Sequence, residues 1–162
     1  MNRRRLVRRA ALVLVGGIVL VGTMGQGCVI TFPATKTVDV ELTDLTTTQV
    51  QAYIWSDPGT IDDPTQLMTT PPIDIGPPLN PGTSAVPAEV ARLTFDCGDA
   101  GTLVADGDLL LPTGSVPSSN ILVVQQGRDF ECGDTISFRY NTDGAGGFFT
   151  SVYVNDVLVA PK

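Results

Sequence analysis

Short runs in which apolar and polar residues alternate constrain the fold of this chain more than any other feature. In the run TVDVELT, Val38, Val40 and Leu42 alternate with polar neighbours, and QVQAYIW repeats the pattern at residues 49–55. A period of two is typical of a β-strand with one buried face. No segment beyond residue 36 shows a sustained helical period, so the sequence predicts an all-β domain.

Further strand-like runs follow, separated by Gly, Pro, Asn and Asp residues that favour turns. Asp106-Gly107 predicts a type I′ turn inside the run 102–111, and Asn155-Asp156 predicts a final tight hairpin. The expected fold is an antiparallel β-sandwich of about eight or nine short strands, either immunoglobulin-like or jelly-roll-like. The other expected strands span residues 90–95, 121–125, 135–140, 148–154 and 157–159.

A Pro-rich stretch at residues 56–89 interrupts this pattern, and it holds most of the prolines of the chain. Proline fixes the backbone and removes a hydrogen-bond donor, so we expect one long loop here. A short helical turn at 63–68 is expected within it, capped by Asp62 or Asp63. A loop of this length is uncommon in a compact domain, so it is either a solvated crossover or a functional excursion.

The first 28 residues have the layout of an export signal. A head with five arginines precedes an uncharged apolar run at residues 10–21. That run is too short to span a membrane comfortably and has the length of a signal-peptide core. The letters MGQGC at 24–28 resemble the lipobox of bacterial lipoproteins, and the head, NRRRLVR, is similar to a twin-arginine export motif.

The lipoprotein resemblance implies that residues 1–27 are a cleaved signal peptide and that Cys28 carries palmitate-type acyl chains. Residues 28–36 would be a lipidated tether, and 37–162 the β-sandwich domain. The protein would then be exported and anchored in the lipid bilayer of the cell membrane or outer membrane. Two or three acyl chains would hold the protein firmly in the bilayer, because each buried methylene group contributes about 0.8 kcal/mol. An ordinary cleaved signal peptide and an uncleaved anchor remain alternatives.

The other two cysteines, Cys97 and Cys132, stand in the similar settings FDCGD and FECGD. Once Cys28 is lipidated, an even pair is left in an oxidising compartment, which predicts a disulfide. The Gly-Asp after each Cys predicts a tight turn at a strand end. Such a bridge would stabilise the fold by roughly 3–4 kcal/mol. The alternative is a metal site made with Asp99 and Asp134.

Charge and composition exclude several classes of function. The chain has no His, which removes the commonest general base and the commonest zinc ligand. Beyond residue 27 it has seventeen acidic and five basic residues, a net charge of −12. Such a surface repels nucleic acid, so no nucleic-acid partner is expected. We expect no enzyme, although a carboxylate pair that hydrolyses glycosides is one alternative.

These observations predict a non-catalytic structural or protein-interaction role in the cell envelope, with an envelope protein as partner. The alternative is a carbohydrate-binding module in which Tyr53 and Trp55, on one face of a predicted strand, stack against sugar rings. The competing interpretation places Trp55 in the core. No cofactor is expected, and the alternative is calcium, for which the loops offer candidate oxygen ligands. These are Asp106, Asp108, Asn141 and Asp143.

Overall fold

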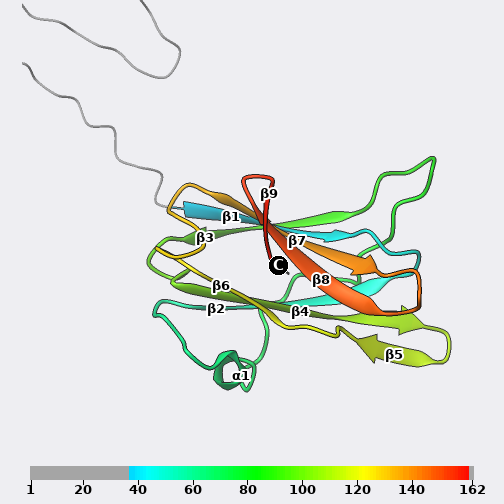
Figure 1. The fold of residues 1–162 in the computed structure, drawn as a ribbon, viewed down its shortest axis with the longest axis horizontal. Coiled ribbons are helices and arrows are strands. Elements are labelled where there is room, and N and C mark those ends of the chain that lie inside the picture. Colours follow the sequence, from blue (N-terminus) through cyan, green and yellow to red (C-terminus); the bar gives the residue numbers. More distant parts are fainter. Residues whose placement is uncertain (1–36, 161–162) are drawn as a thin grey trace, which may run out of the picture. The chain divides into compact units, whose positions relative to one another are not determined.

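The computed structural model describes residues 37–160, which form two β-sheets packed face to face (Figure 1). This confirms the predicted all-β sandwich. No helix of the described residues is long and apolar enough to cross a membrane. The elements within 37–160 are β1 (Thr37–Asp44), β2 (Val50–Asp57), α1 (Pro64–Leu67), β3 (Val90–Asp96), β4 (Thr102–Leu111), β5 (Gly114–Pro117), β6 (Leu122–Gln125), β7 (Thr135–Thr142), β8 (Phe148–Val154) and β9 (Val157–Ala160).

The strands divide into a five-stranded and a four-stranded sheet. The first has the order β3-β1-β7-β8-β9, and the second places β2 on one side of β4 with β5 and β6 on the other. The pairings are antiparallel, as expected, except that β1 runs parallel to β7. The segment between β1 and β2 therefore connects the two sheets.

The core lies between the sheets and follows from the alternation seen in the sequence. On β1, and over most of β2, every second side chain points inward and is buried, because a strand turns successive side chains to opposite faces. Tyr140 and Phe148 are among the largest fully buried side chains, and their rings stack with centroids 6.1 Å apart. The main core contributors from β1, β2, β4 and β7 are Val38, Val40, Leu42, Val50, Ala52, Ile54, Leu103, Ala105, Ile136 and Phe138.

The predicted turn at Asp106-Gly107 is wrong, because β4 runs unbroken through both residues. Gly107 faces Tyr140 of the opposite sheet, and a Cβ atom at this position would lie 2.8 Å from Tyr140 Cε1. The Tyr140 hydroxyl donates to the backbone oxygen of Asp106 at 2.9 Å. Glycine is therefore needed here for close approach of the sheets. The predicted hairpin at the C-terminal end is confirmed, since Asn155 and Asp156 both have positive φ between β8 and β9.

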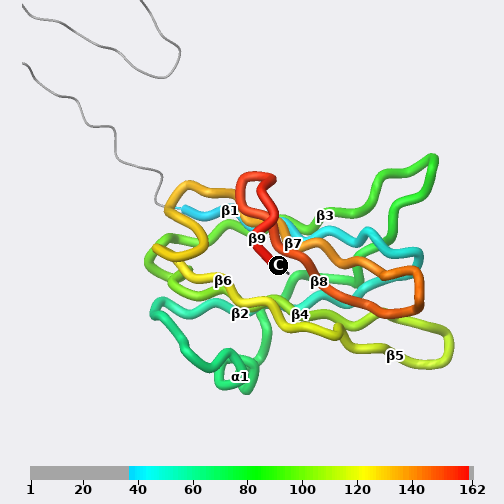
Figure 2. The backbone as a smooth tube through the Cα atoms, viewed as in Figure 1, coloured from blue at the N-terminus to red at the C-terminus, as the bar shows by residue number. Residues whose placement is uncertain are grey.

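The Pro-rich stretch is a crossover from β2 to β3 that also contains the predicted helical turn. Asp63 caps α1 by accepting from the backbone N–H of Thr65. Further on, the crossover runs along the free edge of β2, where Val50 and Leu79 exchange backbone hydrogen bonds (Figure 2). Leu79 is buried, so the crossover covers a sheet edge and is not simply solvated.

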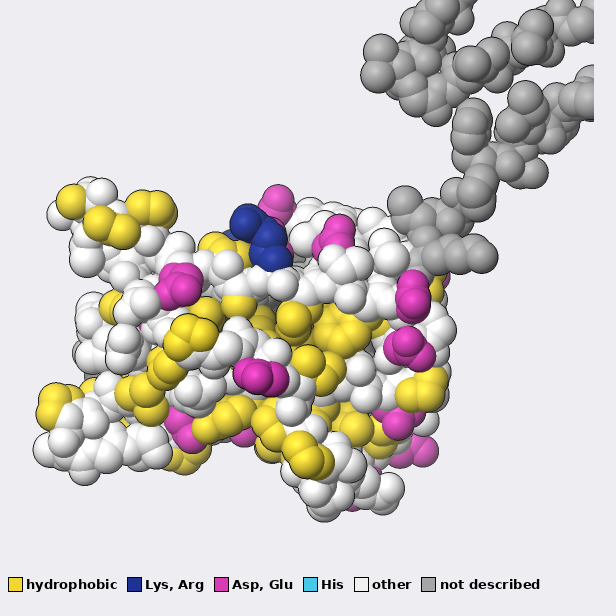
Figure 3. Space-filling view, turned by 180° about the vertical axis from the view of Figure 1, so that it is seen from behind, with side chains coloured by type: hydrophobic (Ala, Val, Ile, Leu, Met, Phe, Trp, Pro, Cys, Tyr) yellow, Lys and Arg dark blue, Asp and Glu magenta, His cyan; other side chains and the backbone are white. Residues whose placement is uncertain are grey.

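The crossover and β3 also close one side of the sandwich. Ile73 and Ile75 from the crossover, with Leu93 and Phe95 from β3, are partly buried against the core. Seen from behind, hydrophobic side chains reach the surface across the middle of this face (Figure 3). Part of the apolar side chains on this side of the domain is therefore accessible to solvent.

The disulfide between Cys97 and Cys132 is present, with its Cα atoms 5.8 Å apart. Cys97 directly follows β3, as expected for a strand end, whereas Cys132 precedes β7. Both strands belong to the five-stranded sheet and have β1 between them. The bridge therefore braces one sheet rather than joining the two.

Candidate functional site

The two ends of the sandwich differ in what they carry. One end holds both Thr37 and the disulfide, because the backbone oxygen of Thr37 accepts from the N–H of Gly133, next to Cys132, at 3.0 Å. We name this the "tether end". We name the "loop end" the opposite one, at the right of Figure 1. Its segments are the β1–β2 loop (45–49), the end of the crossover (80–89), the β4–β5 turn (112–113) and the β7–β8 turn (143–147).

Exposed apolar side chains stand on three separate segments of the loop end. Leu45 in the β1–β2 loop is 50% exposed, and Val86 at the tip of the crossover is 59% exposed. Leu111, where β4 ends, is also exposed. Loops carried on a rigid sandwich are common sites of binding, and of these three residues Leu45 and Val86 line one pocket together.

A pocket of about 240 Å³ lies between the β1–β2 loop and the tip of the crossover. One wall consists of the chain from Asp44 to Thr46. The opposite wall is apolar in part and includes Val86 and Pro87. The pocket is smaller than the roughly 300–1,000 Å³ of sites for drug-sized ligands, so it suits a single side chain or a small molecule.

Asp44 is the charged residue of this pocket, and it is completely buried. Its Oδ1 atom accepts from the backbone N–H of Thr46 at 2.8 Å, but its Oδ2 atom has no hydrogen-bond partner. Burial raises the pKa of Asp44, because a carboxylate loses hydration there, and the bonds from Thr46 offset this only in part. A buried carboxylate oxygen without a hydrogen-bond donor is unfavourable for the folded state.

The loops around the pocket are held in place by their own hydrogen bonds. Glu89 Oε2 accepts from both the backbone N–H and the side-chain amide of Asn80, at 3.0 and 2.7 Å, which closes the neck of segment 80–89. Gln49 of the β1–β2 loop donates to Asn80 Oδ1 at 2.8 Å and thus links the two walls. Gly82 allows the two arms to meet, because a Cβ there would lie 2.8 Å from the backbone nitrogen of Ala88. The pocket is therefore formed before any ligand binds.

Tyr53 and Trp55 share the outer face of β2, as predicted, but only one of them is accessible. Trp55 is 6% exposed and packs with Leu67 of α1 and with Val104. Its indole N–H donates to the backbone oxygen of Thr70 at 2.9 Å. This matches the competing interpretation in part, because Trp55 is buried in a small second cluster outside the main core. A sugar ring would find only the half-buried Tyr53, whose hydroxyl donates to Asp108 at 3.1 Å.

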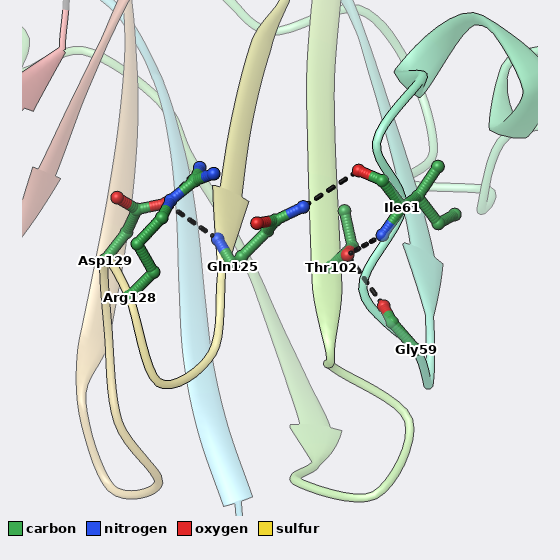
Figure 4. Close-up of polar contacts among 6 residues, drawn as sticks. All are labelled: Gly59, Ile61, Thr102, Gln125, Arg128 and Asp129. Atoms are coloured by element: carbon green, nitrogen blue, oxygen red, sulfur yellow. Dashed lines mark hydrogen bonds and ion pairs between the residues drawn. The ribbon is translucent and has the colours of Figure 1, made fainter.

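A buried polar network fixes the segment that leads to α1 (Figure 4). Thr102 Oγ1 donates to the backbone oxygen of Gly59 at 2.7 Å and accepts from the N–H of Ile61 at 3.2 Å. The Gln125 side chain donates to the oxygen of Ile61 at 2.8 Å. Asp129 in turn accepts from the backbone N–H of Gln125. These contacts position α1 over Trp55, and their role is structural.

The outer face of the five-stranded sheet is polar and internally paired. Arg139 lies 3.0 Å from Asp156 and 3.9 Å above the centre of the Tyr153 ring. Arg92 pairs with Glu41 at 2.9 Å. Exposed pairs of this kind contribute little to stability, and this surface offers a ligand no unpartnered buried group among the described residues.

The structure does not bring the four calcium candidates together. Asp106 faces outward from β4, since its neighbours Ala105 and Gly107 face the core, whereas Asn141 faces outward from β7 in the other sheet. Asp143 Oδ1 is occupied by the backbone N–H groups of Ala145 and Gly147, both at 2.8 Å. Within residues 37–160 no group of three or more His, Cys, Asp or Glu side chains could hold a metal ion.

Two of the three cysteines, Cys97 and Cys132, are oxidised to the disulfide, so the two-thiolate metal site is not formed. Cys28 lies outside the described residues, and its lipidation stays a prediction. Asp44 was not among the residues predicted for a site. The signal for it was present, because Asp44 continues the buried alternation of Val40 and Leu42 by one more step.

The chain was also compared with known proteins. No protein-family model matches it, and no curated protein matches it significantly. The geometry of the loop end is therefore the basis on which its function is inferred.

Proposed function

We propose that this protein is a lipid-anchored, non-catalytic binding domain of the cell envelope, and that it engages a protein partner through its loop end. The observation that carries the proposal is the placement of exposed Leu45, Val86 and Leu111 on three segments at the end opposite Thr37. Exposed apolar side chains at one end of a domain are suited to contact with another protein.

The position of the tether supports this orientation. Cys28 precedes Thr37 by the short segment 28–36, so a lipid on Cys28 would join the domain at the tether end. β1 has 8 residues. At about 3.3 Å per residue, β1 separates the two ends by roughly 26 Å. The loop end would then face away from the membrane surface, where a partner can reach it.

The chemistry of the pocket supports binding rather than catalysis. Asp44 is its only titratable lining residue among the described part of the chain. Hydrolytic acid–base chemistry needs two cooperating groups, for example the two carboxylates of glycosidases. A single buried carboxylate beside apolar walls is suited to recognition. A glycan partner is less well supported, because the indole of Trp55 is covered by α1.

Photo-cross-linking in the native envelope tests the partner. A photoreactive amino acid is placed at Val86, or at Val157 as a control. Val157 is 68% exposed and follows the β8–β9 turn at the tether end. We expect irradiation to give a discrete adduct from position 86 and none from 157. Adducts from both positions alike, or from neither, would contradict a binding surface at the loop end.

The same membranes test the anchor. The protein is extracted, alkylated without reductant, and its intact mass is measured. We expect a mass that begins at Cys28 plus acyl chains, with no alkylated thiol. A mass that retains residues 1–27, or a product without lipid, would remove the anchor from the proposal and leave the loop-end surface to be judged by the cross-links.

A further inference from the structure

We propose that the free edge of β3 pairs with the same edge of a second copy of this chain, so that two five-stranded sheets join into one continuous sheet. The two β3 strands run antiparallel about a two-fold axis at Thr94. This inference goes beyond the proposed function and does not depend on it, because it concerns the side of the sandwich and not the loop end. It is carried by the uncovered edge of β3 and by the order of the side chains along that strand.

The edge of β3 is the first step. In the described part of the chain, the backbone of Val90–Phe95 pairs only with β1, so the N–H and C=O groups on its other side have no backbone partner. The other edges are better protected: the crossover pairs with β2, β5 contains Gly114 and Pro117, and β6 and β9 have 4 residues each. β3 has 7 residues and neither Gly nor Pro. An uncovered strand of this kind is a template for pairing with another chain.

Apolar side chains beside this edge are the second step. Leu93 and Phe95 of β3, with Ile73 and Ile75 of the crossover, are only partly buried against the core. Figure 3 looks onto this side of the sandwich and shows hydrophobic atoms across its middle. Pairing through β3 would bring Leu93 and Phe95 of one copy onto those of the other. Removal of such surface from water is the main favourable contribution to most protein association.

The order of side chains along β3 selects the register. Residues that stand opposite each other on paired strands belong to the same face, so the axis must lie at a residue and not between two. An axis at Arg92 sets the two arginines against each other, and an axis at Leu93 sets Arg92 against Thr94. Only an axis at Thr94 sets Arg92 of each copy against Asp96 of the other. The same axis sets Leu93 against Phe95, and both kinds of opposed pair are favourable.

The groups that would meet are accessible. The Arg92 side chain is 71% exposed, and Thr94 and Asp96 are exposed as well. Arg92 Nε donates to Glu41 of its own chain at 2.9 Å. A guanidinium has five N–H donors, so others remain for Asp96 of a second copy. The domain as a whole is acidic, but at 0.15 M salt the Debye length is about 8 Å, so the charges at the edge dominate the approach.

The pairing leaves the loop end free for another protein. Thr37 stands opposite Asp96 in the β1–β3 pair, so in this register the two Thr37 residues lie near the middle of the dimer. The two loop ends then lie at its outer ends. If both copies are anchored in one bilayer through Cys28, the dimer would lie along the membrane surface, whereas the unpaired domain stands upright.

A cysteine at position 94 tests the register. Residues opposite each other in an antiparallel pair have Cα atoms about 4.5–5.5 Å apart, within the range of a disulfide. We expect full-length Thr94→Cys in its native membrane to give a reducible dimer after mild oxidation. Val116→Cys, on the exposed edge strand β5, is the control and should remain monomeric. A monomeric Thr94→Cys, or equal dimer from both variants, would overturn the register.

Charge exchange tests the pairing without a new thiol. The dimer fraction of the full-length protein is measured by sedimentation, with detergent micelles in large excess over protein. Arg92→Asp opposes two carboxylates and Asp96→Arg opposes two guanidinium groups, so each variant alone should dimerise at least tenfold more weakly than the wild type. A mixture of the two variants opposes Asp to Arg at both places. It should form mixed dimers within threefold of the wild-type affinity.

Asp62→Arg controls for net charge, because Asp62 is exposed and lies before α1. It changes the charge as much as Asp96→Arg and should dimerise like the wild type. A wild type that stays monomeric in the membrane and in detergent would overturn the inference. So would a mixture no better than its two components, or a loss in Asp62→Arg equal to that in the edge variants.

Discussion

The contact between Gly107 and Tyr140 shows how one residue sets the distance between the two sheets. The Tyr140 ring occupies the space where a side chain at 107 would lie, and burial strongly raises the pKa of its hydroxyl. That hydroxyl donates to Asp106 of the opposite sheet. The tyrosine therefore stays protonated and links the sheets by a hydrogen bond that only a bare backbone at 107 permits.

Gly107→Ala tests this close approach. The added methyl would lie 2.8 Å from the ring, so the sheets must move or the ring must leave its position. We expect unfolding in urea to show a loss of about 1–3 kcal/mol in the free energy of unfolding. Gly98→Ala is the matched control, because a Cβ there meets nothing within 4 Å, and it should change stability by less than about 0.5 kcal/mol. Equal effects of the two substitutions would show that the contact is unimportant.

Single residues are also where the sequence misleads most. Asp-Gly is a strong signal for a hairpin turn, yet Gly107 is required by a ring that lies far along the chain, on β7. Local patterns do not reveal such a contact. Asp44 is the opposite case, because its place on the buried face follows from Val38, Val40 and Leu42. What the alternation does not reveal is that the second oxygen of Asp44 finds no partner.

At the scale of elements, α1 and the crossover protect surfaces of the four-stranded sheet that would otherwise be exposed. Leu67 of α1 packs on Trp55, and the chain beyond α1 pairs with the edge of β2. The helical turn and its cap at Asp63 were predictable from the sequence, because the cap is local. The pairing of a Pro-rich chain with a strand edge was not, because proline is usually read as excluding a sheet.

Leu67→Ala tests whether α1 shields the indole. We expect a loss of about 2 kcal/mol in stability, near the lower limit for buried leucines because the cluster is small and can collapse. Trp55 is the only Trp of the chain, so its emission reports this site directly. The emission should shift to longer wavelength and become more sensitive to acrylamide. Leu158→Ala, at an exposed leucine of β9, is the control. If acrylamide already quenches Trp55 freely in the wild type, α1 does not shield the indole. Stacking of a sugar ring on Trp55 would then again be a candidate function.

For the molecule as a whole, alternation and turn residues were sufficient to predict a sandwich of short strands. They were not sufficient to divide the strands between two sheets, because every half-buried strand shows the same period. The sequence also did not predict that β1 and β7 pair in parallel, nor the strand β5, which is exposed throughout. Pairing partners depend on which apolar faces meet in three dimensions, and no local pattern records that.

The disulfide is the feature whose effect extends over the whole molecule. Its cysteines are 35 residues apart in the sequence. Restricting an unfolded loop of this length stabilises the folded state by about 3–4 kcal/mol in the chain-entropy model. The variant with both Cys97→Ala and Cys132→Ala should lose about that amount, measured by urea unfolding beside the oxidised wild type.

Photo-cross-linking from position 86 supplies the control for this variant, because the bridge is at the tether end and Val86 is at the loop end. The adduct should be unchanged under conditions where the variant remains folded. A stability loss below about 1 kcal/mol would show that the unfolded chain is compact without the bridge.

The position of β1 has a mechanical consequence. If the membrane holds one end of this strand and a partner holds the other, any tension between them runs along β1, which is bonded on both sides, to β3 and to β7. Force along a strand loads its interstrand hydrogen bonds in shear, so they must give way together instead of opening one after another. The chain that joins anchor to partner is thus the strand best placed to withstand a pull.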